Sequence, residues 1–190
     1  MVKFGFIVEG ETEKVLLESH AFHQLISELG AEFIPEIINA DGNGNLLPRN
    51  IEKHSQILKD KGATHILILT DLDKDLCVTE TKNRIQPAQN HYCVVSKKVI
   101  ESWFLSDIDA LRTFVKSNID GYLDPETIDN PFEEIRRVRF QRIGIGFNNK
   151  RKLAYSMLEN GFPFKRAAAH PNCSSAKYFI DKLTLLAKQN

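Results

Sequence analysis

Residues 2–18 read VKFGFIVEGETEKVLLE, and this stretch decides how the rest of the chain is interpreted. A short, continuous apolar run over residues 4–8 is typical of a buried strand. Glu9 follows the run directly, and the glycine after it lets the backbone turn sharply. Apolar residues then recur at helical spacing from Val15 until Gly30, which is a typical helix end. The pattern predicts a strand, a tight turn and one helix.

The clearest strand prediction lies farther along, where residues 64–70 read THILILT. Its centre is fully apolar, as expected for a central strand of a parallel sheet. Residues 32–40 and 92–95 are two further strand candidates, and Pro35 places the first of them at a sheet edge or a bulge. Helical patterns separate the four strands. This alternation predicts an α/β fold, a parallel four-stranded sheet flanked by helices.

The chain of 190 residues is long enough for one domain with a substantial core. Its composition, 42% hydrophobic and 26% charged, is that of an ordinary globular protein. The strand–helix alternation ends near residue 105, and the remainder is predicted to be mostly helical. We therefore expect a single domain over residues 1–190. It consists of an α/β core over residues 1–105 and a helical C-terminal extension over residues 106–190.

Carboxylates follow two of the predicted strands: Glu9 follows the first, and Asp71 and Asp73 follow the third. Ligands of parallel sheets bind beyond the carboxyl ends of the strands. Residues two apart on a strand share one side, so Asp71 and Asp73 are expected to face the same ion. Mg²⁺ prefers oxygen ligands such as carboxylates. A solvated acidic turn is the alternative interpretation of these aspartates.

Two further glutamates are candidate metal ligands. Glu13 lies one helical turn after the first glutamate and would share its helix face, whereas Glu11 suits an ordinary first helical turn. Glu101 interrupts an apolar run, VIESWFL. Because a glutamate is rarely buried unpaired, it needs either a metal ion or a cation. Lys97 and Lys98 are the nearby cations in the sequence, so ligand and structural ion pair both stay open.

Several other kinds of site are excluded by their motifs. The chain contains no GxxxxGK[ST] phosphate loop and no GxGxxG dinucleotide motif. An EF-hand beginning at Asp71 would need glycine at Leu76 and glutamate at Lys82. The DxDx[TV] pattern of aspartate-nucleophile phosphatases would need threonine or valine in place of Asp75. A phosphatase of this kind remains a weaker alternative hypothesis.

Charge is unevenly distributed, although 25 basic residues balance 25 acidic ones. Residues 101–134 hold nine acidic and two basic residues, whereas residues 136–152 hold seven basic residues and no acidic one. Proteins that bind phosphate backbones need such cations, so we expect nucleic-acid contact there. Pairing with the preceding acidic residues is the alternative. The seven residues are Arg136, Arg137, Arg139, Arg142, Lys150, Arg151 and Lys152.

Two of these motifs together resemble a known domain. FIVEGETEK at residues 6–14, followed by ILILTDLDKD at residues 66–75, resembles the Toprim domain of topoisomerases, primases and OLD-type nucleases. The VEGxTE form is most similar to the OLD-type branch. KKVIESWFLSDIDAL at residues 97–111 resembles small stand-alone proteins of the DUF4276 type. The specific likeness covers about the first 105 residues and implies a Toprim-like sheet.

The resemblance implies an enzyme, a Mg²⁺- or Mn²⁺-dependent phosphodiester hydrolase that acts on DNA or RNA in phage defence or DNA repair. Glu9, Asp71 and Asp73 would be catalytic and bind metal, and Glu13 would help to hold a second ion. Glu101 is a further metal candidate from its position alone. Full OLD proteins carry an ATPase domain that is not seen in this sequence, so the resemblance leaves open whether a separate ATPase acts as a partner.

Two other functions remain open: a non-catalytic nucleic-acid- or partner-binding component of a defence system, and a phosphatase for small substrates. Three cysteines without a CxxC motif argue against a disulfide framework or a zinc site. No apolar run approaches the ~18 residues of a membrane span, and the start of the sequence lacks a signal-peptide pattern. We expect a cytoplasmic protein without membrane association.

Overall fold

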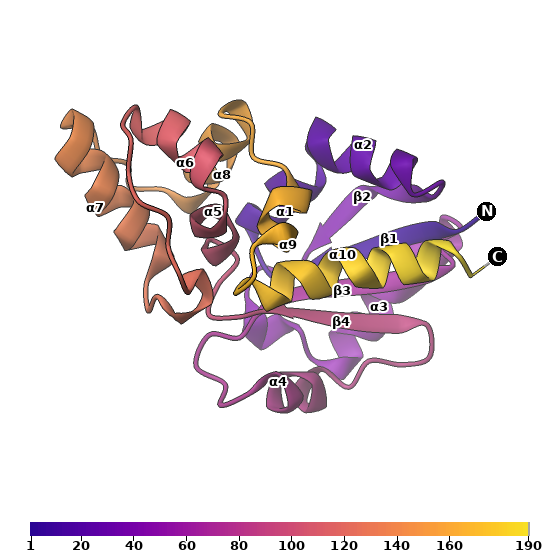
Figure 1. The fold of residues 1–190 in the computed structure, drawn as a ribbon. Coiled ribbons are helices and arrows are strands. Elements are labelled where there is room, and N and C mark those ends of the chain that lie inside the picture. Colours follow the sequence, from indigo (N-terminus) through magenta and orange to yellow (C-terminus); the bar gives the residue numbers. More distant parts are fainter. Residues whose placement is uncertain (190) are drawn as a thin grey trace.

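The computed structural model describes residues 1–189 and confirms the α/β prediction (Figure 1). All four strands pair in parallel, in the order β2-β1-β3-β4. The strands are β1 (Lys3–Val8), β2 (Glu32–Asn39), β3 (His65–Asp71) and β4 (His91–Ser96). The helices between them are α1 (Glu11–Leu17), α2 (His20–Glu28), the short η1 (Asn43–Asn45), α3 (Pro48–Asp60) and α4 (Val78–Ile85).

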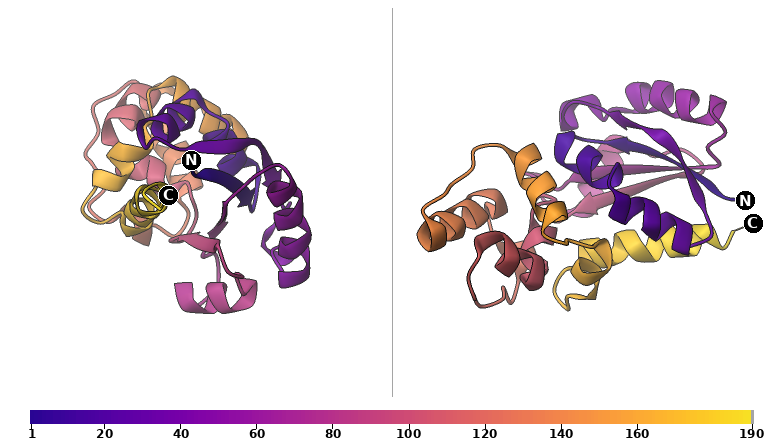
Figure 2. Two further views of the ribbon diagram at one scale, coloured as in Figure 1. Left: turned by 90° about the vertical axis from the view of Figure 1, so that its right-hand side faces the viewer. Right: turned by 90° about the horizontal axis from the view of Figure 1, so that it is seen from above.

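The C-terminal half is helical, as predicted. It contains α5 (Ser102–Ser106), α6 (Ile108–Val115), η2 (Pro125–Thr127), α7 (Pro131–Ile143), α8 (Lys150–Glu159), α9 (Phe164–Ala169) and α10 (Ser174–Ala187). Helices α6 and α7 lie at the end of the molecule opposite the two chain termini, beyond the carboxyl ends of the strands (Figure 2). No helix within residues 1–189 has both the length and the apolar character needed to cross a membrane.

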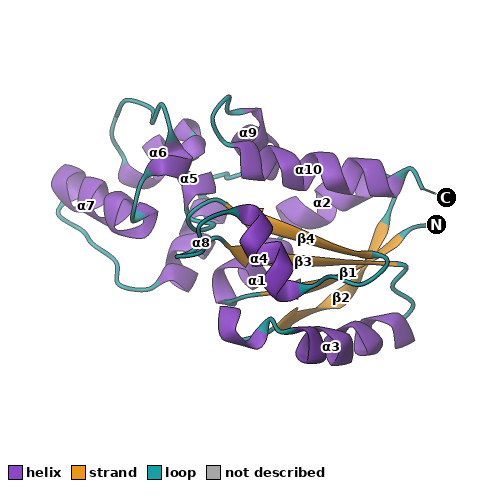
Figure 3. Ribbon diagram, turned by 90° about the horizontal axis from the view of Figure 1, so that it is seen from below, coloured by secondary structure: helices purple, strands orange, loops and turns teal. Residues whose placement is uncertain are grey.

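Alternate side chains of the strands enter two separate cores, because successive strand residues point to opposite faces. Phe6 and Leu67 belong to the larger core, which the C-terminal helices share with α1 and α2. Ile7 and Ile66 belong to the smaller core, under α3 and α4. Figure 3 shows α3 and α4 on one side of the sheet, with α2 and α10 on the other. The sheet is thus a central layer between helices.

The helical extension packs back against the sheet. Trp103 of α5 is fully buried, and its indole Nε1 donates a hydrogen bond of 2.8 Å to Ser175 Oγ at the start of α10. Helix α10 then runs along the sheet beside β4 (Figure 1). The apolar core is therefore continuous between the strands and the C-terminal helices.

The first helical region differs from the prediction. The expected single helix is two helices, since the chain breaks at Ser19, whose Oγ accepts from Phe22 N at 3.2 Å and caps α2. Ser19 also donates to Leu16 O, so its side chain competes with the helical backbone pattern. The edge position predicted from Pro35 is confirmed, because β2 is an edge strand with a register shift opposite Phe4 and Phe6.

Glu126 links η2 to the start of α10. Its carboxylate is buried and accepts hydrogen bonds from Ser174 N at 3.0 Å, Ser174 Oγ at 2.9 Å and Ser175 N at 2.7 Å. It thereby satisfies the free amides at the start of α10. We expect Glu126→Ala to lower the free energy of unfolding by about 2 kcal/mol. Urea denaturation measures this, with exposed Glu52→Ala as the control; equal stabilities of the two variants would contradict the capping role.

Candidate metal-binding and catalytic site

Four of the five predicted carboxylate ligands line one pocket of about 610 Å³ at the carboxyl edge of the sheet. Glu9 follows β1, Asp71 is the last residue of β3, and Glu13 lies in the first turn of α1. Glu101 immediately precedes α5. The parallel sheet and the helices that begin at its edge therefore bring together residues that are up to 92 positions apart.

Glu9 and Asp71 are each held through one oxygen atom. Glu9 Oε2 accepts hydrogen bonds from Thr70 Oγ1 at 2.6 Å and from Asp71 N at 3.0 Å. Asp71 Oδ1 accepts from Ile100 N at 2.9 Å and from Ser96 Oγ. These bonds fix both carboxylates at neighbouring strand ends. The second oxygen of each is left for a ligand, because it has no hydrogen bond within the described part of the chain.

Glu101 has a cation partner that the sequence did not identify. Its side chain is 1% exposed, and Lys150 Nζ lies 3.3 Å from each of its two carboxylate oxygens. Thr12 Oγ1 donates to Glu101 Oε1 at 3.4 Å. Lys150 is the first residue of α8, and α8 packs on α1, which positions the ammonium group over the pocket. Thr12 is thus a site residue that sequence analysis missed, and Lys150, which was predicted only to contact nucleic acid, was not expected beside Glu101.

The predicted cation partners of Glu101 were wrong. Lys97 lies 3.6 Å from Glu126, and Lys98 lies 2.9 Å from Asp129. Both lysines belong to the turn after β4, where Lys98 has a left-handed backbone with φ +61°. That turn directs them toward the segment that contains η2, so proximity along the chain did not predict the ion pair.

The pocket carries surplus negative charge. Burial raises the pKa of Glu13 to about 8, with the nearby carboxylates of Glu101 and Glu9 adding to the effect. Burial also raises the pKa of Asp71 well above its usual range, followed by repulsion from Glu13 and Glu101. Burial raises the pKa of Glu9 despite its hydrogen bonds. A bound cation would relieve this repulsion.

Lys150 compensates only part of the negative charge in the pocket. Burial opposes its charge, but attraction to Glu101, Asp71 and Glu13 outweighs burial, so the pKa of Lys150 is raised. Its side chain is 51% exposed, and solvent therefore screens the interaction. Glu11 and Arg151 also line the pocket, so two cations face five carboxylates there.

The raised pKa of Glu13 predicts a pH-dependent stability. The folded protein keeps a proton on Glu13 up to about pH 8, whereas the unfolded chain releases it near 4.5. The free energy of unfolding should therefore fall as pH rises between these values, by up to about 1.4 kcal/mol per pH unit for this group. Glu13→Gln should flatten that dependence, and Glu52→Gln should not. Urea unfolding from pH 5 to 8.5 in EDTA measures it; parallel slopes for wild type and Glu13→Gln would contradict the assignment.

Asp73 lies outside the pocket lining. Its backbone is left-handed, with φ +48°, so the strand alternation that the prediction assumed ends at Asp71. Its Oδ2 accepts a hydrogen bond from Asn43 Nδ2 at 2.9 Å. It still lies close enough to Glu9 for its charge to add to the raised pKa of that residue. Asp73 as a metal ligand stays a prediction.

The basic segment divides between α7 and α8. On α7, Arg136 pairs with Glu133 at 3.2 Å, and Arg137 makes a two-bond pair with Glu134 at 2.9 and 2.7 Å. These are the pairings with preceding acidic residues that formed the alternative interpretation. Arg139 lies with its guanidinium carbon 3.9 Å from the centre of the Phe114 ring.

The remaining basic residues are more available to a ligand. Arg142 at the end of α7 and Lys152 in α8 are exposed. Arg151 lines the carboxylate pocket beside Lys150 and lies 3.6 Å from Glu11. Nucleic-acid binding by the seven basic residues stays a prediction. The geometry places Lys150 and Arg151 at the pocket itself.

The carboxylates are not positioned to bind one metal ion together in this structure. Within residues 1–189, no three Asp, Glu, His or Cys side chains are arranged as a group that could hold a metal ion. An ion in this pocket would therefore require some of the side chains to rotate.

A family model described as a domain of unknown function, DUF4276, matches residues 8–183. The chain belongs to the DUF4276 family. This confirms the resemblance seen in residues 97–111. The comparison with curated proteins found no match to this DUF4276 chain. Among solved structures, the C-terminal region of the Burkholderia pseudomallei OLD protein is similar, with a TM-score of 0.47 and 16% identity over 97% of this chain and 99% of that one. The Toprim resemblance stays a prediction.

Proposed function

We propose that this DUF4276 protein is a metal-dependent phosphodiester hydrolase that acts on nucleic acid. The observation that carries the proposal is the shared pocket, in which Glu9, Glu13, Asp71 and Glu101 meet Lys150 at the carboxyl edge of the sheet. Clusters of carboxylates with raised pKa values at such an edge are typical of functional sites. The Toprim-like motifs in the sequence support the same function.

The donor atoms suit Mg²⁺ or Mn²⁺. The four candidate ligands all offer oxygen, and neither histidine nor cysteine lines the pocket. Glu9 and Asp71 would hold an ion through the oxygens that are free of hydrogen bonds, with Glu13 and Glu101 as further ligands. Such an ion, when bound, activates water and stabilises charge on a phosphoryl oxygen. Asp73 would add its negative charge to the site from a position next to Glu9, outside the pocket lining.

The chain's own cations complete the proposed site. Lys150 and Arg151 begin α8 and line the same pocket as the carboxylates. In this proposal they attract the phosphate and hold it against the pocket. Asn149 caps α8 by accepting a hydrogen bond from Lys152 N at 3.0 Å, which fixes where the helix begins. A role in phage defence or DNA repair, with an ATPase partner, remains a prediction.

Cleavage assays separate this function from its rivals. Labelled single-stranded and duplex DNA and RNA, and p-nitrophenyl phosphate, are incubated with the protein in Mg²⁺, Mn²⁺ or EDTA. We expect cleavage of a nucleic acid in the presence of either ion and none in EDTA. Hydrolysis of p-nitrophenyl phosphate alone would support a small-substrate phosphatase. Binding of nucleic acid without cleavage under any of these conditions would support a non-catalytic component.

A further inference from the structure

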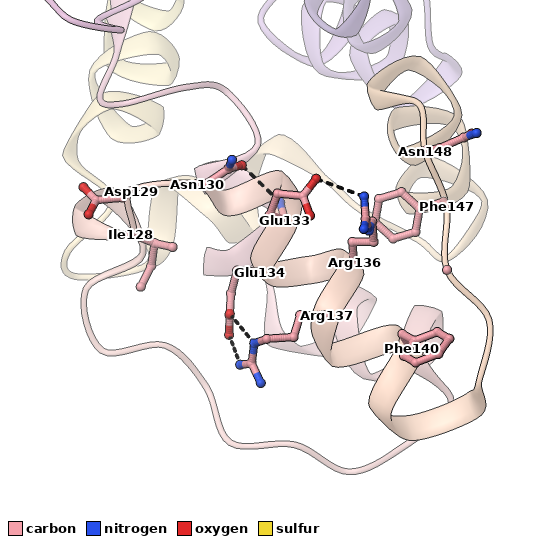
Figure 4. A pocket seen from close by; sticks show the side chains of 11 residues that line it. Ile128, Asp129, Asn130, Glu133, Glu134, Arg136, Arg137, Phe140, Phe147 and Asn148 are labelled. Atoms are coloured by element: carbon pink, nitrogen blue, oxygen red, sulfur yellow. Dashed lines mark hydrogen bonds and ion pairs between the residues drawn. The ribbon is translucent and has the colours of Figure 1, made fainter.

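A second and larger hollow lies along α7. It has a volume of about 1060 Å³, and Ile128, Phe140 and Phe147 provide its apolar lining (Figure 4). We call it the α7 groove. Asn148 lines both the α7 groove and the carboxylate pocket, so the two hollows adjoin at this residue. A single strand that occupies both hollows would have to pass Asn148.

Two aromatic rings line the α7 groove, and one of them is largely exposed. Phe140 is 61% exposed and lies near the end of α7, while Phe147 lies on the loop that returns toward α8 (Figure 4). Phe147 is held edge-on by Phe132 and Phe114, with ring centres 5.2 and 5.7 Å away. One ring is thus free at the surface, and the other is fixed by the core. Such rings offer flat faces for stacking.

The charges of the α7 groove do not suit a phosphate backbone. Three acidic residues, Asp129, Glu133 and Glu134, line it against two arginines. Arg137 keeps only two of its five N–H donors for a phosphate, because the other three already donate to Glu134 and Gln141. Carboxylates instead accept hydrogen bonds from the amino groups of bases. The lining therefore favours an uncharged, flat, hydrogen-bonding ligand.

We propose that the α7 groove binds unpaired nucleobases of the strand whose phosphodiester lies in the carboxylate pocket. The substrate class is then single-stranded nucleic acid, an inference that rests on the proposed function. Phosphates lie on the side of Asn148 where Lys150 and Arg151 are, and bases lie on the side where Phe140 is. Bases in a duplex are stacked and paired, so only an unpaired strand can present their faces to these rings.

Fluorescence anisotropy with labelled 12-nucleotide strands in EDTA tests the proposal without cleavage. We expect wild-type protein to bind single strands at least about 10-fold more tightly than duplexes, and Phe140→Ala to weaken single-strand binding by about 10-fold. Duplex binding should not change in this variant. Leu185→Ala is the matched control, since Leu185 is 54% exposed on α10 and away from both hollows. Thermal melting confirms that both variants are folded.

The salt dependence of binding distinguishes stacking contacts from ionic contacts. Phe140→Ala should weaken binding equally at low and high salt because stacking is not ionic, whereas Lys152→Ala should lower the salt dependence. Equal affinity for strands and duplexes, or unchanged single-strand affinity in Phe140→Ala, would overturn the assignment of the α7 groove.

The same variant separates the groove from the proposed hydrolase activity. If wild type cleaves strands in Mn²⁺ and Phe140→Ala has an unchanged KM, the groove assignment fails and the hydrolase stands. If binding that depends on Phe140 occurs but no strand is cleaved, the hydrolase fails and the α7 groove stands as a strand-binding site.

Discussion

Asp71→Asn is expected to abolish most metal-dependent cleavage, lowering the rate by about 10³-fold because the ion it helps to hold supplies several kcal/mol of transition-state stabilisation. Asparagine keeps the oxygen that accepts from Ile100 N and Ser96 Oγ, so the local structure should be retained. The substitution also removes a buried carboxylate whose pKa is raised. The free energy of unfolding should therefore be unchanged or higher.

Single-turnover cleavage of a labelled strand in Mn²⁺ measures this effect, and urea denaturation measures stability alongside it. Glu159→Gln is the matched control, because this exposed glutamate lies at the end of α8, outside the pocket lining. A variant that folds normally and cleaves within a few-fold of wild type would show that Asp71 holds no essential ion.

Lys150→Met is expected to lower the free energy of unfolding by about 3 kcal/mol at pH 8. Breaking a buried ion pair costs about 3–5 kcal/mol. Glu101 is 1% exposed, but the ammonium group of Lys150 is half-exposed and screened by solvent, so we expect a value near the lower limit. Methionine replaces most of the lysine stem, so the change removes mainly the charge. Glu101 is left with the hydrogen bond from Thr12 and without its cation.

A double-mutant cycle isolates the pair. Adding Glu101→Gln to Lys150→Met should restore most of the lost stability, because the buried charge is then gone. Urea denaturation of wild type, both single variants and the double variant provides the four free energies of unfolding. Additive effects of the two substitutions would contradict a specific ion pair between these residues.

Local patterns were enough to predict the framework of the site. Glu9 and Asp71 each come directly after an uninterrupted apolar run, and a parallel sheet brings the ends of its strands to one edge. Glu13 was predicted from helical spacing, and Glu101 from its position in an apolar run. All four line one pocket.

The contacts made by the extension could not be predicted in the same way. Lys150 lies 49 residues after Glu101 and reaches it only because α8 packs on α1. Asp73 was predicted to face the same ion as Asp71, but its left-handed backbone ends the alternation on which that prediction depended. Such turns and distant packing depend on tertiary structure, which neither periodicity nor charge counts encode.

Binding of Mn²⁺, followed by the electron paramagnetic resonance signal of the free ion, tests the carboxylate pocket most directly. Wild type and Glu159→Gln should remove Mn²⁺ from solution in a saturable manner, and Mg²⁺ should compete. Asp71→Asn should weaken that binding by at least about 10-fold. No saturable binding by wild type, or equal binding by Asp71→Asn, would contradict the assignment of this pocket as a metal site.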